Sequence, residues 1–187
     1  MLPLGTPAPD WKLPAPATGQ FHDLDGSMGE KGLLVAFICN HCPYVVHVMP
    51  ELDRLFDGLP AEGVGVVAVN ANDVEKYPQD GPDKMAELVA ARGWKIPFLL
   101  DETQQVAKAY HAACTPDFYL FDRNRELVYR GQLDGSRPGN DVPVTGEDLR
   151  EAIRRLLEGR EGLSFQRPSL GCNIKWKPGN EPDYFGS

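Results

Sequence analysis

In the stretch Leu33-Leu34-Val35-Ala36-Phe37-Ile38-Cys39-Asn40-His41-Cys42-Pro43, a continuous apolar run leads directly into two cysteines. An uninterrupted apolar run of this length predicts a buried β-strand over residues 33–38. Beyond it, apolar side chains recur at helical spacing, which predicts a helix over residues 43–57. Pro43 fits the first helical position, where its missing N–H is not needed. A buried strand is therefore expected to deliver both cysteines to the first turn of a helix.

This position favours the thiolate form of a cysteine, because free N–H groups and the helix dipole stabilise negative charge. The thiol pKa of Cys39 is therefore predicted to lie below the usual value of about 8.5. Cys42 follows about one helical turn later, so its sulfur can reach that of Cys39. We predict that Cys39 is the exposed nucleophile that attacks a partner's disulfide, and that Cys42 resolves the mixed disulfide. A partly charged imidazole at His41 would further favour the Cys39 thiolate.

A CxxC pair can instead be half of a zinc site or a structural disulfide. No second CxxC motif and no HxxxH motif follows in the sequence, which counts against zinc. We therefore expect a redox pair that uses no cofactor and holds no metal.

Three motifs together resemble the thioredoxin superfamily. A strand, a CxxC and a helix are followed far downstream by Thr115-Pro116. Residues 5–14 resemble the start of the peroxiredoxin-like AhpC/TSA branch. The tail carries a third motif, Gly171-Cys172-Asn173-Ile174-Lys175-Trp176-Lys177-Pro178-Gly179. With this motif, the whole chain is similar to peroxiredoxin-like thioredoxin-family proteins of bacteria. The resemblance implies a thioredoxin-like α/β fold, with a central mixed β-sheet flanked by helices, an N-terminal β extension and a C-terminal tail.

The resemblance also implies which residues surround the cysteines. In that superfamily, the pair matching Thr115-Pro116 has a cis peptide bond that faces the cysteines. The backbone of its first residue pairs there with the bound peptide of a partner. We therefore expect the site to be shaped by Asn40, His41, Pro43, Thr115 and Pro116.

One departure leaves the proton chemistry open. Thioredoxins keep a buried acid six residues before the first cysteine, and Leu33 occupies that position here. Candidates for the proton acceptor of Cys42 are Asp73 and a water molecule. Asn72 and Asp73 follow a predicted strand over residues 64–70, at the sheet edge where sites gather. The alternative is that one of them caps a short turn.

Peroxide reduction is the alternative activity. Peroxiredoxins place a Cys-Pro at the helix start, with a threonine three residues before the cysteine. Aligned in that way, Cys42 is the peroxidatic cysteine, and Cys39 takes the place of the threonine. A proline expected upstream is replaced by Val35, and the arginine expected near residue 116 is missing. We therefore rank thiol-disulfide exchange first, an antioxidant thiol peroxidase second, and a non-enzymatic metal-binding or scaffold protein third.

The remaining cysteines, Cys114 and Cys172, allow several interpretations. They can be two buried reduced thiols, which pack as small hydrophobic groups. They can form a second redox pair that ties the tail over the active face. The tail thiol can also resolve an oxidised active cysteine, or all four cysteines can bind a metal. The sequence leaves these alternatives open.

Composition limits the partners. The chain has 187 residues, a net charge of −8 and a pI near 5.0, which disfavours nucleic-acid binding. No apolar run approaches the about 20 residues of a membrane span. The N-terminal residues lack the basic and apolar parts of a signal peptide, so a cytoplasmic location is expected. The expected partners are a protein or small-molecule disulfide and an unknown recycling partner, with neither nucleic acid nor membrane.

The chain length suits one domain with additions. We predict a thioredoxin-like domain over residues 1–160, in which residues 1–32 form the N-terminal extension. Residues 161–187 form a tail that carries large apolar side chains, which a free linker would lack: Phe165, Leu170, Ile174, Trp176, Tyr184 and Phe185. We therefore expect this tail to pack on the domain.

Overall fold

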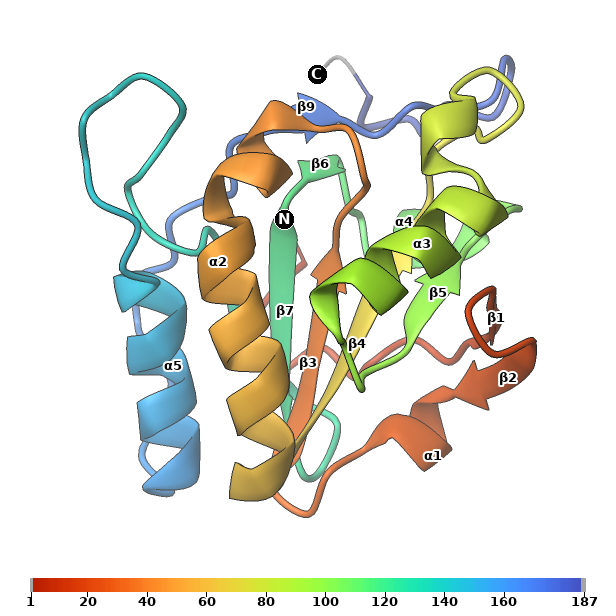
Figure 1. Cartoon of the computed structure of the whole chain (residues 1–187). Coiled ribbons are helices and arrows are strands. Elements are labelled where there is room, and N and C mark those ends of the chain that lie inside the picture. Colours follow the sequence, from red (N-terminus) through yellow and green to blue (C-terminus); the bar gives the residue numbers. More distant parts are fainter. Residues whose placement is uncertain (1, 186–187) are drawn as a thin grey trace.

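Five strands form the central sheet of the computed structural model, which describes residues 2–185 (Figure 1). Their spatial order is β5 (Phe98–Leu100), β4 (Val64–Asn70), β3 (Gly32–Phe37), β7 (Asp117–Asp122) and β8 (Leu127–Gly131). β3 lies at the centre, parallel to β4 and antiparallel to β7. This mixed sheet with flanking helices confirms the predicted thioredoxin-like α/β fold.

Every residue of β3 is buried, because both faces of the sheet are covered. Leu34 and Ala36 pack in one apolar cluster with side chains of α2 (Pro43–Gly58), α3 (Pro82–Arg92) and α5 (Glu147–Leu157). Leu33, Val35 and Phe37 point to the other face, as the alternation of a strand requires. That second cluster contains side chains of α4 (Gln105–Ala109) and of β1 (Lys12–Ala15), which forms a hairpin with the more exposed β2 (Gln20–Asp23).

Five short elements complete the secondary structure of residues 2–185. They are the helix α1 (Leu24–Ser27), two 3-10 helices over Leu59–Glu62 and Pro78–Asp80, and β6 (Cys114–Thr115) with β9 (Cys172–Asn173). Within residues 2–185, no helix has the length and apolar character that crossing a membrane requires.

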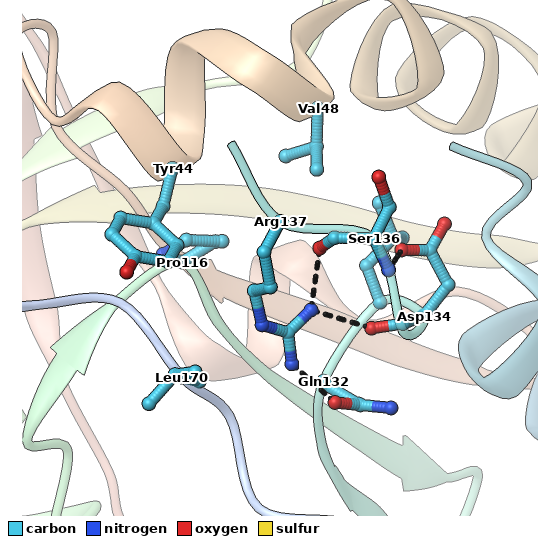
Figure 2. A pocket seen from close by; sticks show the side chains of 9 residues that line it. Tyr44, Val48, Pro116, Gln132, Asp134, Ser136, Arg137 and Leu170 are labelled. Carbon is cyan, nitrogen blue, oxygen red and sulfur yellow. Dashed lines mark hydrogen bonds between the residues drawn. The ribbon is translucent and has the colours of Figure 1, made fainter. Parts of the chain in front are cut away.

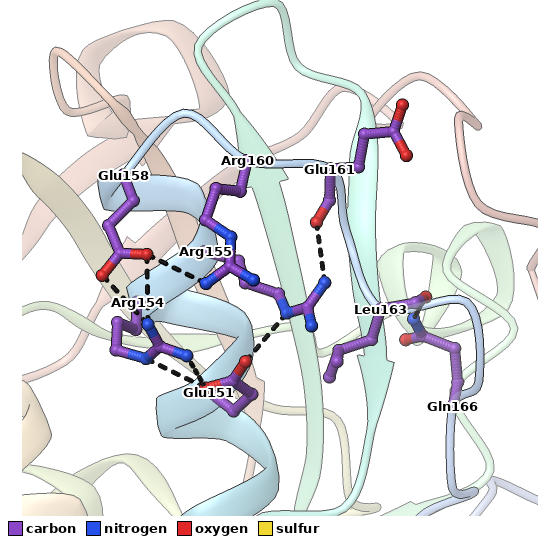
Figure 3. Close-up of polar contacts among 8 residues, drawn as sticks. All are labelled: Glu151, Arg154, Arg155, Glu158, Arg160, Glu161, Leu163 and Gln166. Carbon is purple, nitrogen blue, oxygen red and sulfur yellow. Dashed lines mark hydrogen bonds and ion pairs between the residues drawn. The ribbon is translucent and has the colours of Figure 1, made fainter.

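The last helix shows how polar and apolar faces are divided. Leu149 and Ile153 of α5 are buried in the core. Its outer face carries ion pairs such as Arg155 Nε to Glu151 Oε1 at 2.8 Å (Figure 3). Exposed pairs of this kind contribute little to stability, so the apolar face holds α5 in place.

The C-terminal tail contacts the domain along several elements. β9 pairs antiparallel with β6, and Ile174 and Trp176 are buried in the cluster under the sheet. The N–H of Lys175 donates to Asn72 Oδ1, and the N–H of Asp73 donates to the Lys175 carbonyl. These contacts tie residues 172–176 to the carboxyl end of β4.

Ile174→Ala tests whether the tail contributes to the stability of the domain. Ile174 is buried, so its truncation is expected to lower the free energy of unfolding by about 2–5 kcal/mol. Leu170→Ala is the matched control in the same tail; Leu170 is exposed, and its change should stay within about 0.5 kcal/mol. Chemical denaturation measures both. Equal, small effects would mean that the tail is energetically independent of the domain.

Candidate active site

The two cysteines lie on a loop between β3 and α2. Helix α2 begins at Pro43, and Cys42 is its N-cap residue with extended backbone angles (φ −64°, ψ 122°). Cys39 lies before the helix, whereas the sequence predicted both cysteines on its first turn. The difference has a physical cause, because an acceptor outside the helix binds the intervening backbone.

That acceptor is the carboxylate of Asp80, which is fully buried. Its Oδ1 accepts the N–H groups of Asn40 at 2.9 Å and of His41 at 3.2 Å. Its Oδ2 lies 2.6 Å from His41 Nδ1 and accepts from Asn72 Nδ2 at 2.9 Å. The carboxylate therefore holds Asn40 and His41 in a bend, so that these residues do not join the helix.

Sequence reasoning missed Asp80 and named Asp73 or a water molecule as candidates for the proton acceptor of Cys42. Both residues lie in the segment that follows β4, at the sheet edge that the sequence analysis identified. Asp73 Oδ1 instead accepts the N–H groups of Glu75 and Lys76, at 3.2 and 3.3 Å, and so caps its own turn. One sequence pattern could have indicated Asp80. Proline and glycine residues that favour turns flank this acid in Pro78-Gln79-Asp80-Gly81-Pro82.

Thr115 contacts both sulfurs. The Thr115-Pro116 peptide bond is cis, as the resemblance implied. Cys42 Sγ lies 3.3 Å from the Thr115 carbonyl oxygen, to which it donates when both cysteines are protonated. Thr115 Oγ1 lies 3.6 Å from Cys39 Sγ. The strand end at residue 115 thus faces the cysteine loop.

Beside Pro116 lies a small pocket, lined by Tyr44 and Val48 of α2 and by Leu170 of the tail (Figure 2). Its polar wall is the loop after β8, where Arg137 donates to the carbonyl oxygens of Asp134 and Ser136. The pocket lies next to the cysteine pair, because Pro116 follows the residue that contacts both sulfurs.

The charge distribution on the pair reverses the sequence prediction. A hydrogen bond from Cys39 lowers the pKa of Cys42 to about 4; Thr115, Cys172 and the Val45 N–H contribute, against the opposing effect of burial. The hydrogen bond to Cys42, burial and the charge of Asp80 raise the pKa of Cys39. These directions favour the thiolate on Cys42 and the thiol on Cys39. The prediction that Cys39 is exposed is wrong, since Cys39 is 1% and Cys42 0% exposed, and the raised pKa of Cys39 is opposite to the predicted direction.

The other two cysteines lie close by and are free thiols. Cys114 is buried, and burial raises its pKa to about 12. Cys172 is only half-buried, and its pKa is raised to about 11 by burial and by its hydrogen bond to Cys42. Of these two cysteines, Cys172 of the tail is therefore the one that hydrogen-bonds to Cys42.

Among the described residues, Cys39, His41 and Asp80 offer three ligand atoms within 4.8 Å of one another. A metal ion there would compete with the contacts that both Asp80 oxygens already make. It would also need Cys39 as a thiolate, although the environment of Cys39 favours its thiol. This donor set suits a hydrogen-bonded turn better than a metal centre.

Comparison with known proteins extends over most of the chain. The family model described as Redoxin matches residues 3–149. A thiol-disulfide oxidoreductase ResA of Geobacillus kaustophilus is 30% identical over 155 residues, which cover 83% of this chain and 76% of that protein. The sporulation thiol-disulfide oxidoreductase A of Bacillus subtilis is 25% identical over 123 residues, 66% of each chain.

Solved structures include two much closer relatives. An uncharacterized conserved protein from Geobacillus kaustophilus is 52% identical, with a TM-score of 0.93 over 95% of this chain and 94% of that one. A hypothetical protein from Sinorhizobium meliloti 1021 is 46% identical, with a TM-score of 0.92 over 96% and 97%. A peroxidoxin from Mycobacterium tuberculosis is 13% identical, with a TM-score of 0.61 over 85% of this chain and 98% of that one, and shares the fold.

A pH titration of the reduced protein tests where the thiolate resides. With a pKa near 4, Cys42 stays ionised as the pH falls from 9 to 5 and becomes protonated only near pH 4. The ultraviolet absorbance of the thiolate should therefore persist through neutral pH. It should disappear in Cys42→Ser and be unchanged in Cys114→Ser, the buried control. A midpoint near the free-thiol value of about 8.5 would contradict this assignment.

Proposed function

The chain belongs to the Redoxin family of the thioredoxin superfamily, and from this premise we propose that it is a thiol-disulfide oxidoreductase with Cys39 and Cys42 as its redox pair. The chain is related to thiol-disulfide oxidoreductases at about 30% identity. The observation that carries the proposal is the placement of Cys42 at the N-cap of α2, with Thr115 in contact with the sulfurs of both cysteines. The lowered pKa of Cys42 supports it. A stabilised thiolate next to a second thiol is the arrangement that disulfide exchange requires.

In the proposed reaction, the Cys42 thiolate attacks one sulfur of a partner's disulfide, and the other sulfur leaves as a thiolate. Cys39 then attacks the Cys42 sulfur, so that the partner is released as a thiol and the Cys39–Cys42 disulfide forms. This order exchanges the roles that the sequence suggested for the two cysteines. Its support is the lowered pKa of Cys42 and the raised pKa of Cys39.

Cys39 must lose its proton for the second step. Once Cys42 is in a mixed disulfide, its hydrogen bond and its negative charge no longer raise the pKa of Cys39, although burial and the charge of Asp80 still do. A carboxylate oxygen of Asp80 lies within 4.8 Å of the Cys39 sulfur. We assign Asp80 as the group that accepts this proton, in place of the Asp73 suggested by the sequence.

The low pKa of Cys42 also bears on the direction of electron flow. A thiolate stabilised at neutral pH favours the reduced form of the pair, which makes the disulfide form the better oxidant. The substrate class that fits is a protein or small-molecule disulfide or dithiol, with a separate partner that recycles the pair.

Peroxide reduction is the second candidate, for one specific reason. Cys42 is the N-cap residue with Pro43 next to it, and its sulfur is the thiolate, as a peroxidatic cysteine requires. The groups that lower its pKa are two thiols, a threonine and a backbone N–H, without an arginine among them to polarise a peroxide bond. Disulfide exchange therefore remains the better supported activity.

Turnover of oxidised glutathione and of hydrogen peroxide, measured side by side, tests the proposal. Cys42→Ser should lower disulfide turnover more than about a hundredfold, because it removes the nucleophile. Cys114→Ser, which removes a buried thiol outside the pair, should retain the wild-type rate. Strong peroxide turnover that survives Cys39→Ser would favour the peroxidase instead. Wild-type disulfide turnover in Cys42→Ser would rule out the mechanism.

A further inference from the structure

The tail is docked on the strand end that contacts the cysteine pair. β9 pairs antiparallel with β6, with Thr115 opposite Cys172 and Cys114 opposite Asn173. Gly171 approaches so closely that a Cβ there would lie 1.9 Å from the Thr115 carbonyl oxygen. The N–H of Ile174 donates to the Ala113 carbonyl at 3.0 Å, which continues the pairing beyond β9. Only a glycine allows the tail to sit this close to Thr115.

This register directs Cys172 toward the active cysteines. Residues directly opposite each other in an antiparallel pair project on the same face, and neighbours along a strand alternate. The Thr115 side chain contacts the Cys39 sulfur, so the side chain of Cys172, opposite Thr115, projects to that face. Cys114 precedes Thr115 and projects to the opposite face. Cys172 accordingly packs against the apolar cluster that contains Cys42.

We propose that Cys172 is a second resolving thiol for Cys42, in competition with Cys39. The proposal rests on the proposed function, because it needs a mixed disulfide at Cys42. It differs from a Cys114–Cys172 redox pair, since the strand register places these two side chains on opposite faces. Cys172 is also the one of the four cysteines that is not fully buried, so its proton can pass to solvent.

The step balances without an outside oxidant. The Cys172 thiolate attacks the sulfur of Cys42 in its mixed disulfide with the partner. The Cys42–Cys172 bond forms as the bond between Cys42 and the partner's sulfur breaks. The partner leaves as a thiolate and takes up the equivalent of the proton that Cys172 released. Once Cys42 is no longer charged, its contribution to the raised pKa of Cys172 disappears.

The product would hold the tail covalently over the active face. A subsequent attack by Cys39 on Cys42 would form the Cys39–Cys42 disulfide and release Cys172 as a thiol. The protein would then have two oxidised forms of equal oxidation state, one with the tail bonded to Cys42 and one with the tail free. In the first of these forms the tail would cover the pair, and in the second it would be free to move away.

The test uses the double variant Cys39→Ser with Cys114→Ser, in which only Cys42 and Cys172 remain. After reaction with oxidised glutathione and alkylation of free thiols, intact mass and peptide mapping should find a Cys42–Cys172 disulfide and no bound glutathione. When Cys172→Ser is added, the glutathione adduct on Cys42 should persist. A persistent adduct on Cys42 in the double variant would overturn the proposal. A failure of Cys42 to form any adduct in either variant would instead contradict the proposed function.

A second variant keeps all four thiols and changes only the docking of the tail. Gly171→Ala forces the tail away from Thr115, so the yield of the Cys42–Cys172 disulfide should fall several-fold and Cys42 should be alkylated faster. Gly58→Ala is the matched control, because a Cβ there meets no atom within 4 Å. Circular dichroism verifies that both variants are folded. An unchanged disulfide yield in folded Gly171→Ala would contradict the role of the docked strand.

Discussion

The hydrogen bonds from the cysteine loop to the buried Asp80 carboxylate determine the rest of the site. They hold Asn40 and His41 outside the helix, so α2 begins at Pro43 and Cys42 becomes its N-cap. The same carboxylate places a negative charge near Cys39, which disfavours a thiolate there. The charge of this buried acid adds to the hydrogen bond with Cys42 and to burial, which also raise the pKa of Cys39.

Three segments far apart in the sequence meet at these sulfurs. The cysteine loop follows β3, Thr115 lies in β6 before the cis proline, and Cys172 lies in β9 of the tail. Thr115 connects them, since its side chain and carbonyl contact the pair while its strand pairs with the tail. A short strand end with unpaired backbone groups readily accepts another strand, and here the chain supplies that strand itself.

The sequence was sufficient for the features that depend on local pattern. The buried run over residues 33–38 and the helix from Pro43 follow from apolar spacing, and the mixed sheet follows from the resemblance carried by Thr115-Pro116 and the CxxC. The pKa directions of the cysteines could not be predicted in this way, because they depend on burial and on long-range partners: Thr115, Cys172 and Asp80. Helix geometry alone predicted the lowered pKa at Cys39. The pairing of Cys172 with Thr115 depends likewise on a long-range backbone contact that no local pattern specifies.

The cysteine pair and the tail cysteine lie in different parts of the chain. The Redoxin match ends at residue 149, so the cysteine pair lies inside the family region and Cys172 lies outside it. The two closest-fitting structures described above cover 95% and 96% of this chain, a share that must include most of the tail. The docked tail is therefore part of an architecture that extends beyond the family region. The proposed disulfide exchange uses the pair and Asp80, whereas the tail places a third sulfur beside Cys42 through the pairing of β9 with β6.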